Sequence, residues 1–160
     1  MTKGELLALV ASERARLDAA VEGLRRNALL EEALPDGRTG KDILAHLTWY
    51  EREMVGVLRE RALVGSDLWG VPQPERNAVI HSENRDRPLD EVLLDYARVH
   101  EELEGLLEGL EEPELHDAAR FREMPPEWPP WEVFADNTYE HYAGHLPEFE
   151  RLAQKGSAER

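Results

Sequence analysis

The chain contains no cysteine. This excludes disulfide bonds, thiolate nucleophiles and cysteine-ligated zinc, so a transition-metal site would have to be built from histidines and carboxylates. Long apolar runs are also missing, and none approaches the roughly 20 residues that cross a membrane. The first five residues lack the basic flank, apolar stretch and small-residue cleavage site of a signal peptide. We therefore expect a cytoplasmic protein with no membrane segment.

Positive charge is scarce, with 19 Lys and Arg residues against 34 Asp and Glu residues and a formal net charge of −15. Such a surface repels the phosphates of nucleic acids and anionic lipids at long range, so neither is expected as a partner. High acidity by itself usually means a solvated surface and does not identify a partner. A length of 160 residues is typical of one domain. We predict a single domain over residues 1–154 and a flexible C-terminal tail over residues 155–160.

Alternation of the strand type is absent, whereas four long segments repeat apolar residues at helical spacing. The sequence therefore predicts an all-α protein. The first helix is expected from about Thr2 to Asn27, where Thr2 and Glu5 have the spacing of a capping box. The second helix is expected to begin after Thr39, with Asp42 in the equivalent position.

Two long connections separate these helices. The first covers residues 64–88 and contains a short helical piece near residues 75–82. A connection of this length can return along a whole bundle, so we predict that the second and third helices run parallel. The result is an up-down-down-up four-helix bundle with a long crossover between its second and third helices, the third running from Pro88 to near Pro113.

The second connection, residues 111–129, is rich in proline and aromatic residues. Long loops of this kind act as functional lids or as packed covers over the core, and the sequence leaves both interpretations open. The fourth helix is expected from about Pro130 to Gln154, with a bend where Pro147 removes a backbone donor.

Three histidines are the strongest candidates for chemistry. His141 and His145 are four residues apart, so they share the inner face of the fourth helix and can place two imidazoles on one metal ion. The alternative is a pair of core histidines bonded to Tyr, Thr or Asn side chains. His46 lies at the edge of the inner stripe of the second helix, at a level where antiparallel packing would bring all three imidazoles together.

Other polar residues near these levels are candidates for supporting roles. Tyr50 and Asn137 are each one turn from a proposed ligand, and His100 lies on the inner stripe of the third helix, so all three could contact a ligand imidazole or a substrate. Glu53, His100 and Tyr50 are the candidate catalytic groups. Ordinary buried packing, or for Glu53 a surface position, is the alternative in each case. His81 and His116 are expected to be solvated.

Several familiar signatures are missing. No HExxH or Glu-x-x-His motif occurs, which disfavours a zincin protease and a carboxylate di-iron bundle. No GxGxxG, Walker or GxSxG motif occurs either, so neither a nucleotide cofactor nor a serine nucleophile is indicated.

The sequence resembles the DinB-like superfamily of four-helix bundles, specifically its ClbS/DfsB-type branch, over nearly the whole chain. The resemblance rests on residues 40–47 (GKDILAHL), 75–77 (ERN) and 137–145 (NTYEHYAGH). It implies a divalent ion, most often zinc or nickel, held by His46, His141 and His145. The branch commonly has an aromatic residue just before the cap of the second helix, where this chain has Arg38.

Membership in such a family does not fix the activity, because relatives include bacillithiol- or mycothiol-dependent S-transferases, a mycothiol-dependent isomerase and ClbS-type self-protection proteins. The resemblance implies a metal-dependent transferase or hydrolase that acts on a small electrophile, with a low-molecular-weight thiol as a candidate co-substrate. A non-catalytic bundle that binds a metal or ligand, and a bundle whose histidines are only polar core residues, are the alternatives. A homodimer remains open.

Overall fold

The computed structural model describes residues 1–158. Over that range its regular secondary structure is helical, with two isolated β-bridges and no strand. The predicted all-α class is therefore confirmed. The elements in chain order are α1 (Lys3–Arg26), α2 (Gly40–Glu60), η1 (Asp67–Gly70), α3 (Gln73–Asn84), α4 (Leu89–Glu108), η2 (Glu112–Leu115), η3 (Ala118–Arg120), α5 (Pro130–Asp136) and α6 (Tyr139–Ala158), where η marks a 3₁₀ turn.

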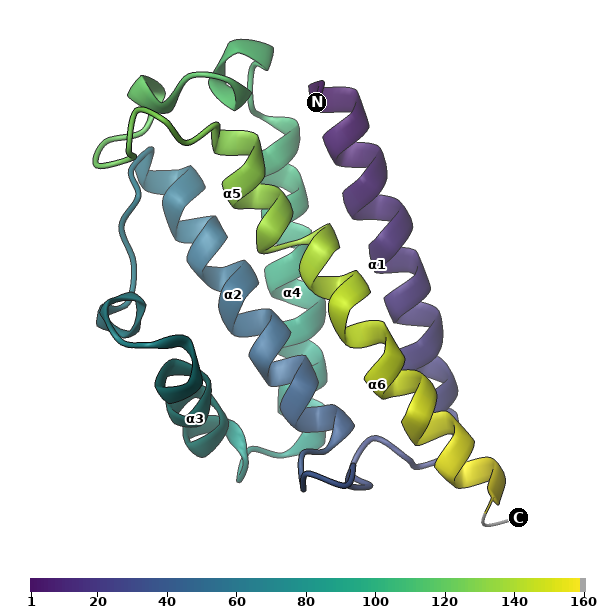
Figure 1. Cartoon of the computed structure of the whole chain (residues 1–160). Helices are drawn as coiled ribbons and strands as arrows, with labels where there is room; N and C mark the ends of the chain where they lie inside the picture. The colour runs from purple at the N-terminus through teal and green to yellow at the C-terminus, as the bar shows by residue number, and fades with distance from the viewer. Residues whose placement is uncertain (159–160) are drawn as a thin grey trace.

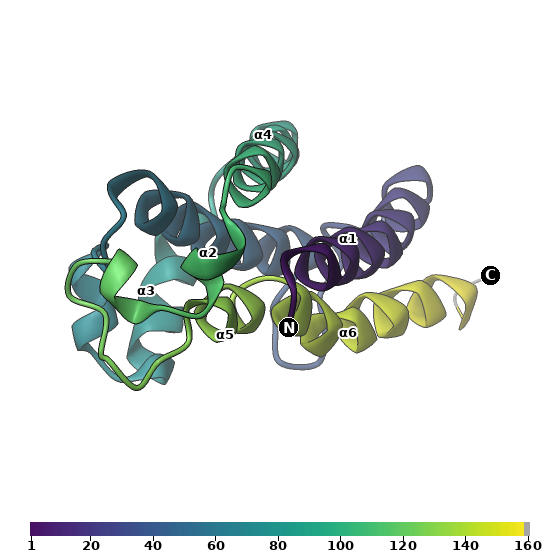
Figure 2. The same cartoon turned by 90° about the horizontal axis from the view of Figure 1, so that it is seen from above.

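The long helices form a bundle in which α1 packs beside α6 and α2 beside α4 (Figures 1 and 2). Helices α2 and α4 run in the same direction, and the crossover that joins them carries η1 and α3 down the outer side of α2 (Figure 1). Helices α5 and α6 run in the opposite direction to α2. This antiparallel arrangement lets side chains from opposite ends of the sequence face each other across the bundle.

Capping fixes where α1 and α2 begin. The hydroxyl of Thr2 accepts the backbone N–H of Glu5, and the hydroxyl of Thr39 accepts that of Asp42, both at 3.1 Å. In return, each carboxylate accepts the backbone N–H of its threonine. These capping boxes satisfy amides that have no partner inside the helix.

None of the helices described in residues 1–158 combines the length and apolarity needed to cross a bilayer.

A buried ionic cluster joins four helices in the interior. The carboxylate oxygen Oε1 of Glu51 in α2 accepts from the guanidinium of Arg14 in α1 at 2.7 Å and from the hydroxyl of Tyr142 in α6 at 2.6 Å. It also lies 3.3 Å from Nδ1 of His100 in α4. Only 1% of Glu51 and 4% of Arg14 are exposed. The periodicity that predicted an apolar core gave no sign of this charged centre.

The predicted fourth helix is interrupted, which is a correction to the sequence-based expectation. The break falls at Asn137 and Thr138, between α5 and α6, whereas α6 continues through Pro147. The side chains of Asn137 and Thr138 bond the carbonyl oxygens of Val133 and Phe134, four residues earlier, at 2.8 and 2.6 Å. Side chains that compete in this way for backbone groups disfavour a regular helix.

Other helix boundaries also differ from expectation. Helix α4 ends at Glu108, before the predicted stop near Pro113, and α3 is longer than the piece predicted over residues 75–82. Helix α6 extends to Ala158, so the first four residues of the predicted C-terminal tail are helical; Glu159 and Arg160 lie outside the described residues.

The connection over residues 111–129 packs over one end of the bundle. Its Phe121 and Met124 are buried. The backbone of Arg122 pairs with that of Arg61 and Leu63, just after α2, at 2.8 and 2.7 Å. These contacts favour the interpretation of this segment as a cover rather than a free lid.

Candidate metal centre

Three histidines meet between α2 and α6. One ligand nitrogen from each of His46, His141 and His145 can be chosen so that all three lie within 4.8 Å of one another. The Nε2 atoms of His46 and His141 are 3.0 Å apart. Two nitrogens bound to one zinc-type ion at about 2.1 Å would lie roughly 3 to 3.4 Å apart, so this pair already has the spacing of shared ligands. Among the residues that the structure describes, this is the one such group of metal-binding side chains.

The electrostatics keep two of these rings uncharged. Burial lowers the pKa of His46 to about 3, with a further contribution from the positive charge of His145 and Arg38. Burial also lowers the pKa of His141 to about 3, assisted by His46 and His145. Their lone pairs are therefore available at neutral pH, which is the state that a metal ion requires. The donor set thus fits a divalent transition metal.

A carboxylate behind one ligand orients its ring. Nδ1 of His145 lies 2.5 Å from Oε1 of Glu148, one turn later in α6. This contact places the proton on Nδ1 and turns Nε2 toward the other histidines, as in the carboxylate–histidine–metal arrangements of metalloproteins. Arg38 forms an ion pair with the other oxygen of Glu148. In contrast, Nδ1 of His141 is buried and has no hydrogen-bond partner.

The three histidines open into a cavity of about 260 Å³ between α2, α3 and α6. Its other polar lining residues come from the N-terminal end of α2 and from the crossover: Arg38, Asp42, Gln73, Asn77 and His81. Nε2 of His81 lies 3.3 Å from Oδ2 of Asp42, which leaves Nδ1 of His81 free to exchange a proton. His81 is 40% exposed. It therefore connects the cavity with solvent.

Tyr50 lies beside the centre, as its position in the sequence predicted. Its ring centroid is 5.0 Å from that of His46 and 4.8 Å from that of His141. Its hydroxyl donates to Oδ1 of Asn77 in α3 at 2.8 Å. Tyr50 thus packs against two of the three ligands and ties them to the crossover.

Two catalytic candidates lie elsewhere. Oε1 of Glu53 accepts the backbone N–H of Ser66 at 2.6 Å and the indole N–H of Trp69 at 2.9 Å, so Glu53 holds the crossover against α2. His100 belongs to the buried cluster around Glu51. Neither residue lines the cavity that contains the histidines. Asn137 is also outside it, and lines a second, larger cavity.

Sequence reasoning missed three residues of this site: Glu148, Arg38 as its partner, and His81. Glu148 had a visible signal, because a position three residues after His145 lies on the same face of the helix. His81 had none, since the periodicity of a short helix in a crossover does not say which face it turns toward the bundle. Arg38 was noted only as a departure from the aromatic residue expected there.

The fold and this site together define a class of protein, the helical bundle with a three-histidine centre between its helices. The sequence profile of the DinB superfamily matches residues 9–151. The chain therefore belongs to the DinB superfamily, as its motifs predicted. A comparison with curated proteins found no match.

Solved structures share this fold. DfsB, described as a sibling lethal factor precursor, superposes with a TM-score of 0.75 over 97% of this chain and 96% of its own, at 17% sequence identity. An uncharacterised protein from Escherichia coli UTI89 gives a TM-score of 0.76 over 98% of this chain and 95% of its own, at 16% identity. At such low identity, the likeness extends to the fold and not to the activity.

Proposed function

We propose that this protein is a divalent-metal-dependent transferase or hydrolase that acts on a small electrophilic molecule at the centre formed by His46, His141 and His145. The observation that carries this proposal is the convergence of three imidazoles, two of them held uncharged by burial, on an accessible cavity. Members of the superfamily generally bind a metal ion, which supports it. Three protein ligands leave coordination positions for water, a thiol or substrate, as in catalytic zinc sites.

Seven residues in and around the cavity have a defined part in this proposal. The three histidines hold the ion, which supplies Lewis-acid polarisation and a lowered pKa for a bound nucleophile. Glu148 fixes the tautomer and direction of His145. His81, oriented by Asp42 through Nε2, accepts a proton at Nδ1 and passes it to solvent. The guanidinium of Arg38 lines the same cavity and can hold an electronegative group of the substrate.

A metal-binding protein without turnover is the second candidate. It is favoured by the placement of Glu53 and His100, the two predicted catalytic groups that have structural partners outside the cavity. The two functions differ in whether His81 is needed.

Metal content provides the first test. The protein is purified without chelator or nickel resin, and bound zinc and nickel are measured by mass spectrometry. We expect about one ion per chain, and a loss of affinity of more than about 100-fold in His141→Ala, since removing an outer partner alone costs 10- to 100-fold. The matched control is His116→Ala. It removes a half-exposed histidine in the connection over residues 111–129, which carries none of the three histidines. Unchanged metal content in His141→Ala would refute the proposed site.

Turnover provides the second test. A small electrophile is offered to the metal-loaded protein alone and with bacillithiol, mycothiol or glutathione. Consumption that depends on a thiol supports a transferase, and consumption without thiol supports a hydrolase. We expect His81→Asn to lower kcat while metal content stays constant. A protein that binds metal but consumes no electrophile under any of these conditions would support the second candidate.

A further inference from the structure

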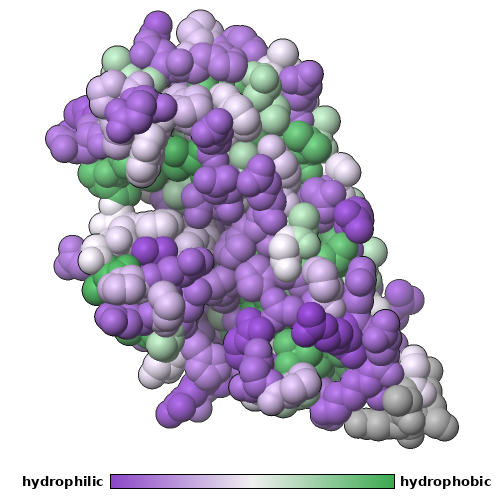
Figure 3. Space-filling model, viewed as in Figure 1, coloured by the Kyte–Doolittle hydropathy of each residue, from purple (hydrophilic) through white to green (hydrophobic). Residues whose placement is uncertain are grey.

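A second cavity, larger than the one at the histidines, lies between the C-terminal half of α2 and α5. Its volume is about 670 Å³, which is enough for a drug-sized ligand. Figure 3 shows the molecule hollowed on this side, between the top loops and the η1–α3 crossover, with hydrophobic residues along the upper rim. The cavity is not explained by the metal centre, because no residue lines both.

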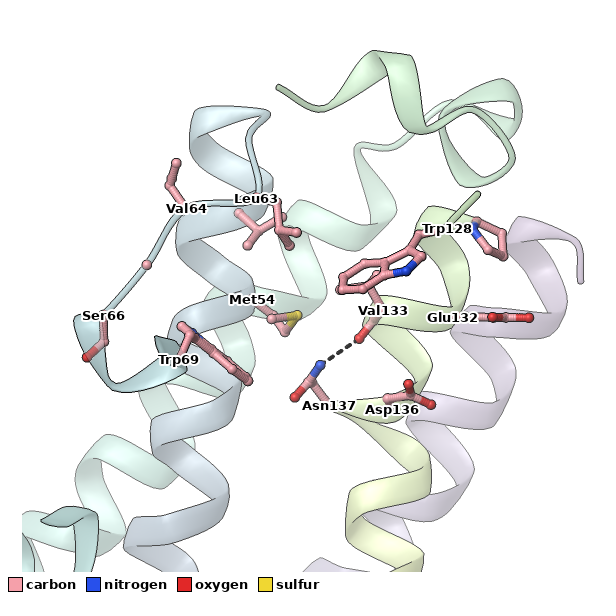
Figure 4. Close-up of a pocket in the computed structure, with 13 residues that line it drawn as sticks. Met54, Leu63, Val64, Ser66, Trp69, Trp128, Glu132, Val133, Asp136 and Asn137 are labelled. Carbon is pink, nitrogen blue, oxygen red and sulfur yellow. Dashed lines mark hydrogen bonds between the residues drawn. The ribbon is translucent and has the colours of Figure 1, made fainter. Parts of the chain in front are cut away.

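Two indoles face each other across this cavity. Trp69 comes from the crossover and Trp128 from the cover segment, with Met54 and Val133 between them (Figure 4). Trp128 is 44% exposed and Trp69 is 37% exposed. Apolar surface of this extent at the mouth of a cavity is typical of a ligand-binding site. Two aromatic side chains on opposite walls favour an aromatic or flat apolar body between them.

One of these indoles is held firmly in place. The indole N–H of Trp69 donates to Glu53, and the guanidinium of Arg76 lies 4.6 Å from the ring centroid. The Trp69 ring also packs against Tyr50, with centroids 5.5 Å apart. A wall whose position is fixed before a ligand arrives costs little conformational entropy on binding.

The polar groups of the cavity are hydrogen-bond acceptors and acids. The amide N–H of Asn137 donates to the carbonyl of Val133, which leaves the amide oxygen turned toward the space beside Trp69 (Figure 4). Glu132 and Asp136 lie on the α5 side, at the edge rather than between the indoles. No Lys, Arg or His residue in the described part of the chain lines this cavity.

The acidic edge has no cation of its own. Neither Glu132 nor Asp136 forms an ion pair with any residue in the described range 1–158. A neighbouring carboxyl, Glu140, has a raised pKa because it shares a hydrogen bond with Asp136, loses part of its hydration and lies near the charge of Asp136 and Glu132. Negative charge therefore accumulates beside an aromatic cavity. A ligand that carries positive charge would relieve it.

We propose that this cavity binds a small molecule with an aromatic or apolar body and a protonated amine. The body lies between Trp69 and Trp128, and the ammonium group lies toward Asn137, Asp136 and Glu132. The site goes beyond the proposed function and does not need the metal ion. Tyr50 separates the two sites, with its ring centroid 5.5 Å from Trp69 and 4.8 Å from His141.

Three probes of similar size test the proposal by calorimetry on the full chain: 2-(1-naphthyl)ethylammonium, 2-(1-naphthyl)ethanol and 1-naphthylacetate. We expect the ammonium to bind about five-fold or more tightly than the alcohol, because of its attraction to aromatic faces and carboxylates. The carboxylate should bind weakest. Equal affinity for all three probes would overturn the charge assignment, and no binding by any of them would overturn the site.

Variants locate the binding. Trp128→Ala, at a position that is 44% exposed, should weaken the binding of the ammonium and the alcohol alike. The double variant Glu132→Gln, Asp136→Asn should weaken only the ammonium. The matched controls are Leu94→Ala, an exposed apolar residue on α4, and Glu150→Gln, an exposed acid on α6. Full affinity in Trp128→Ala would contradict the proposal.

A last comparison separates this site from the metal centre. His141→Ala and chelator-treated protein should retain the affinity for the ammonium probe. Retained affinity together with absent metal would leave the cavity proposal standing while the proposed function fails. The opposite outcome is a His141→Ala protein that loses probe binding although it still unfolds at the wild-type temperature. That result would contradict the proposal that the cavity binds independently of the metal centre.

Discussion

The three histidines have the same chemistry but different surroundings. His145 has a carboxylate behind it, whereas Nδ1 of His141 is buried without a partner. An outer carboxylate raises the basicity of a ligand imidazole and holds its direction. His145 should therefore contribute most to the pre-organisation of the centre.

This difference predicts the effect of Glu148→Gln. The glutamine amide can keep one hydrogen bond to His145, but the substitution removes the negative charge and the ion pair with Arg38. We expect zinc affinity, measured by competition with a chromophoric chelator, to fall about 10-fold, at the lower end of known outer-partner effects. Glu150→Gln, two residues away and exposed, is the control. Equal affinity in both variants would show that Glu148 does not orient the ligand.

The lowered pKa values of His46 and His141 predict how stability depends on pH in the metal-free protein. Both rings resist protonation in the folded state, with pKa values of about 3, but accept protons near 6.5 when the chain unfolds. Their contribution is therefore complete above pH 6.5 and is lost progressively as the pH falls toward 3. Each ring adds a slope of up to about 1.4 kcal/mol per pH unit in that window.

Urea unfolding between pH 7 and pH 5, with chelator present, measures this slope. The double variant His46→Gln, His141→Gln should show a clearly shallower decline than the wild type, while the slope from carboxylates stays common to both. Parallel curves would mean that the two rings titrate normally in the folded protein.

At the scale of single residues, the sequence was informative where the spacing of residues along a helix fixes the direction of their side chains. His141 and His145 share a helix face by simple geometry, and the level of His46 followed from the rise of the helix. Glu53 and Asn137 occupied equally plausible positions, but each faces away from the histidines. A difference of one position on a helix surface decides which neighbour a side chain meets, and periodicity does not resolve it.

At the scale of elements, the start of α2 links capping to the site. Asp42 both accepts the backbone N–H of Thr39 and lies 3.3 Å from His81 through the same oxygen, Oδ2. The first turn of α2 leads directly to His46. A change in this cap should therefore affect the centre as well as the helix.

Thr39→Ala tests this link against a matched cap elsewhere. Both Thr39→Ala and Thr2→Ala remove an N-cap hydroxyl with the same geometry, so each should cost about 1 kcal/mol in the free energy of unfolding. Only Thr39→Ala should also weaken zinc binding. If Thr2→Ala weakens it equally, the effect is one of general stability.

The helices themselves could be predicted because caps, apolar periodicity and proline positions agreed for α1, α2 and α4. The division of the last helical segment into α5 and α6 could not, because the apolar repeat continues through Asn137 and Thr138. Their side-chain bonds to backbone carbonyls are tertiary choices that have little sequence signature. The division has a spatial result, since α5 lines the larger cavity and α6 carries two of the three histidines of the candidate centre.

At the scale of the whole molecule, the buried cluster around Glu51 joins helices from every part of the chain. Oε1 of Glu51 meets Arg14, Tyr142 and His100, whereas Oε2 is buried without a partner. Such a centre holds the relative positions of the helices only while its charges are matched. It lies one turn of α2 beyond the segment that carries His46.

Glu51→Leu should therefore destabilise the protein strongly. It leaves the buried guanidinium of Arg14 without its main counter-charge, a change that costs about 3 to 5 kcal/mol. The control is Arg59→Gln, which breaks an exposed ion pair with Glu102 and should cost at most about 1 kcal/mol. Chemical denaturation of both variants gives the comparison. A small effect of Glu51→Leu would show that Arg14 finds other partners.

The crossover between α2 and α4 supplies one wall of each cavity, with Gly65, Ser66 and Trp69 at the larger and Gln73, Asn77 and His81 at the smaller. The three histidines of the candidate metal centre belong to other segments. In the proposed function, substrate selectivity and metal chemistry would thus be encoded by separate stretches of the gene. A chimera that exchanges residues 64–88 with those of a relative should change which compounds are accepted while its metal affinity stays the same.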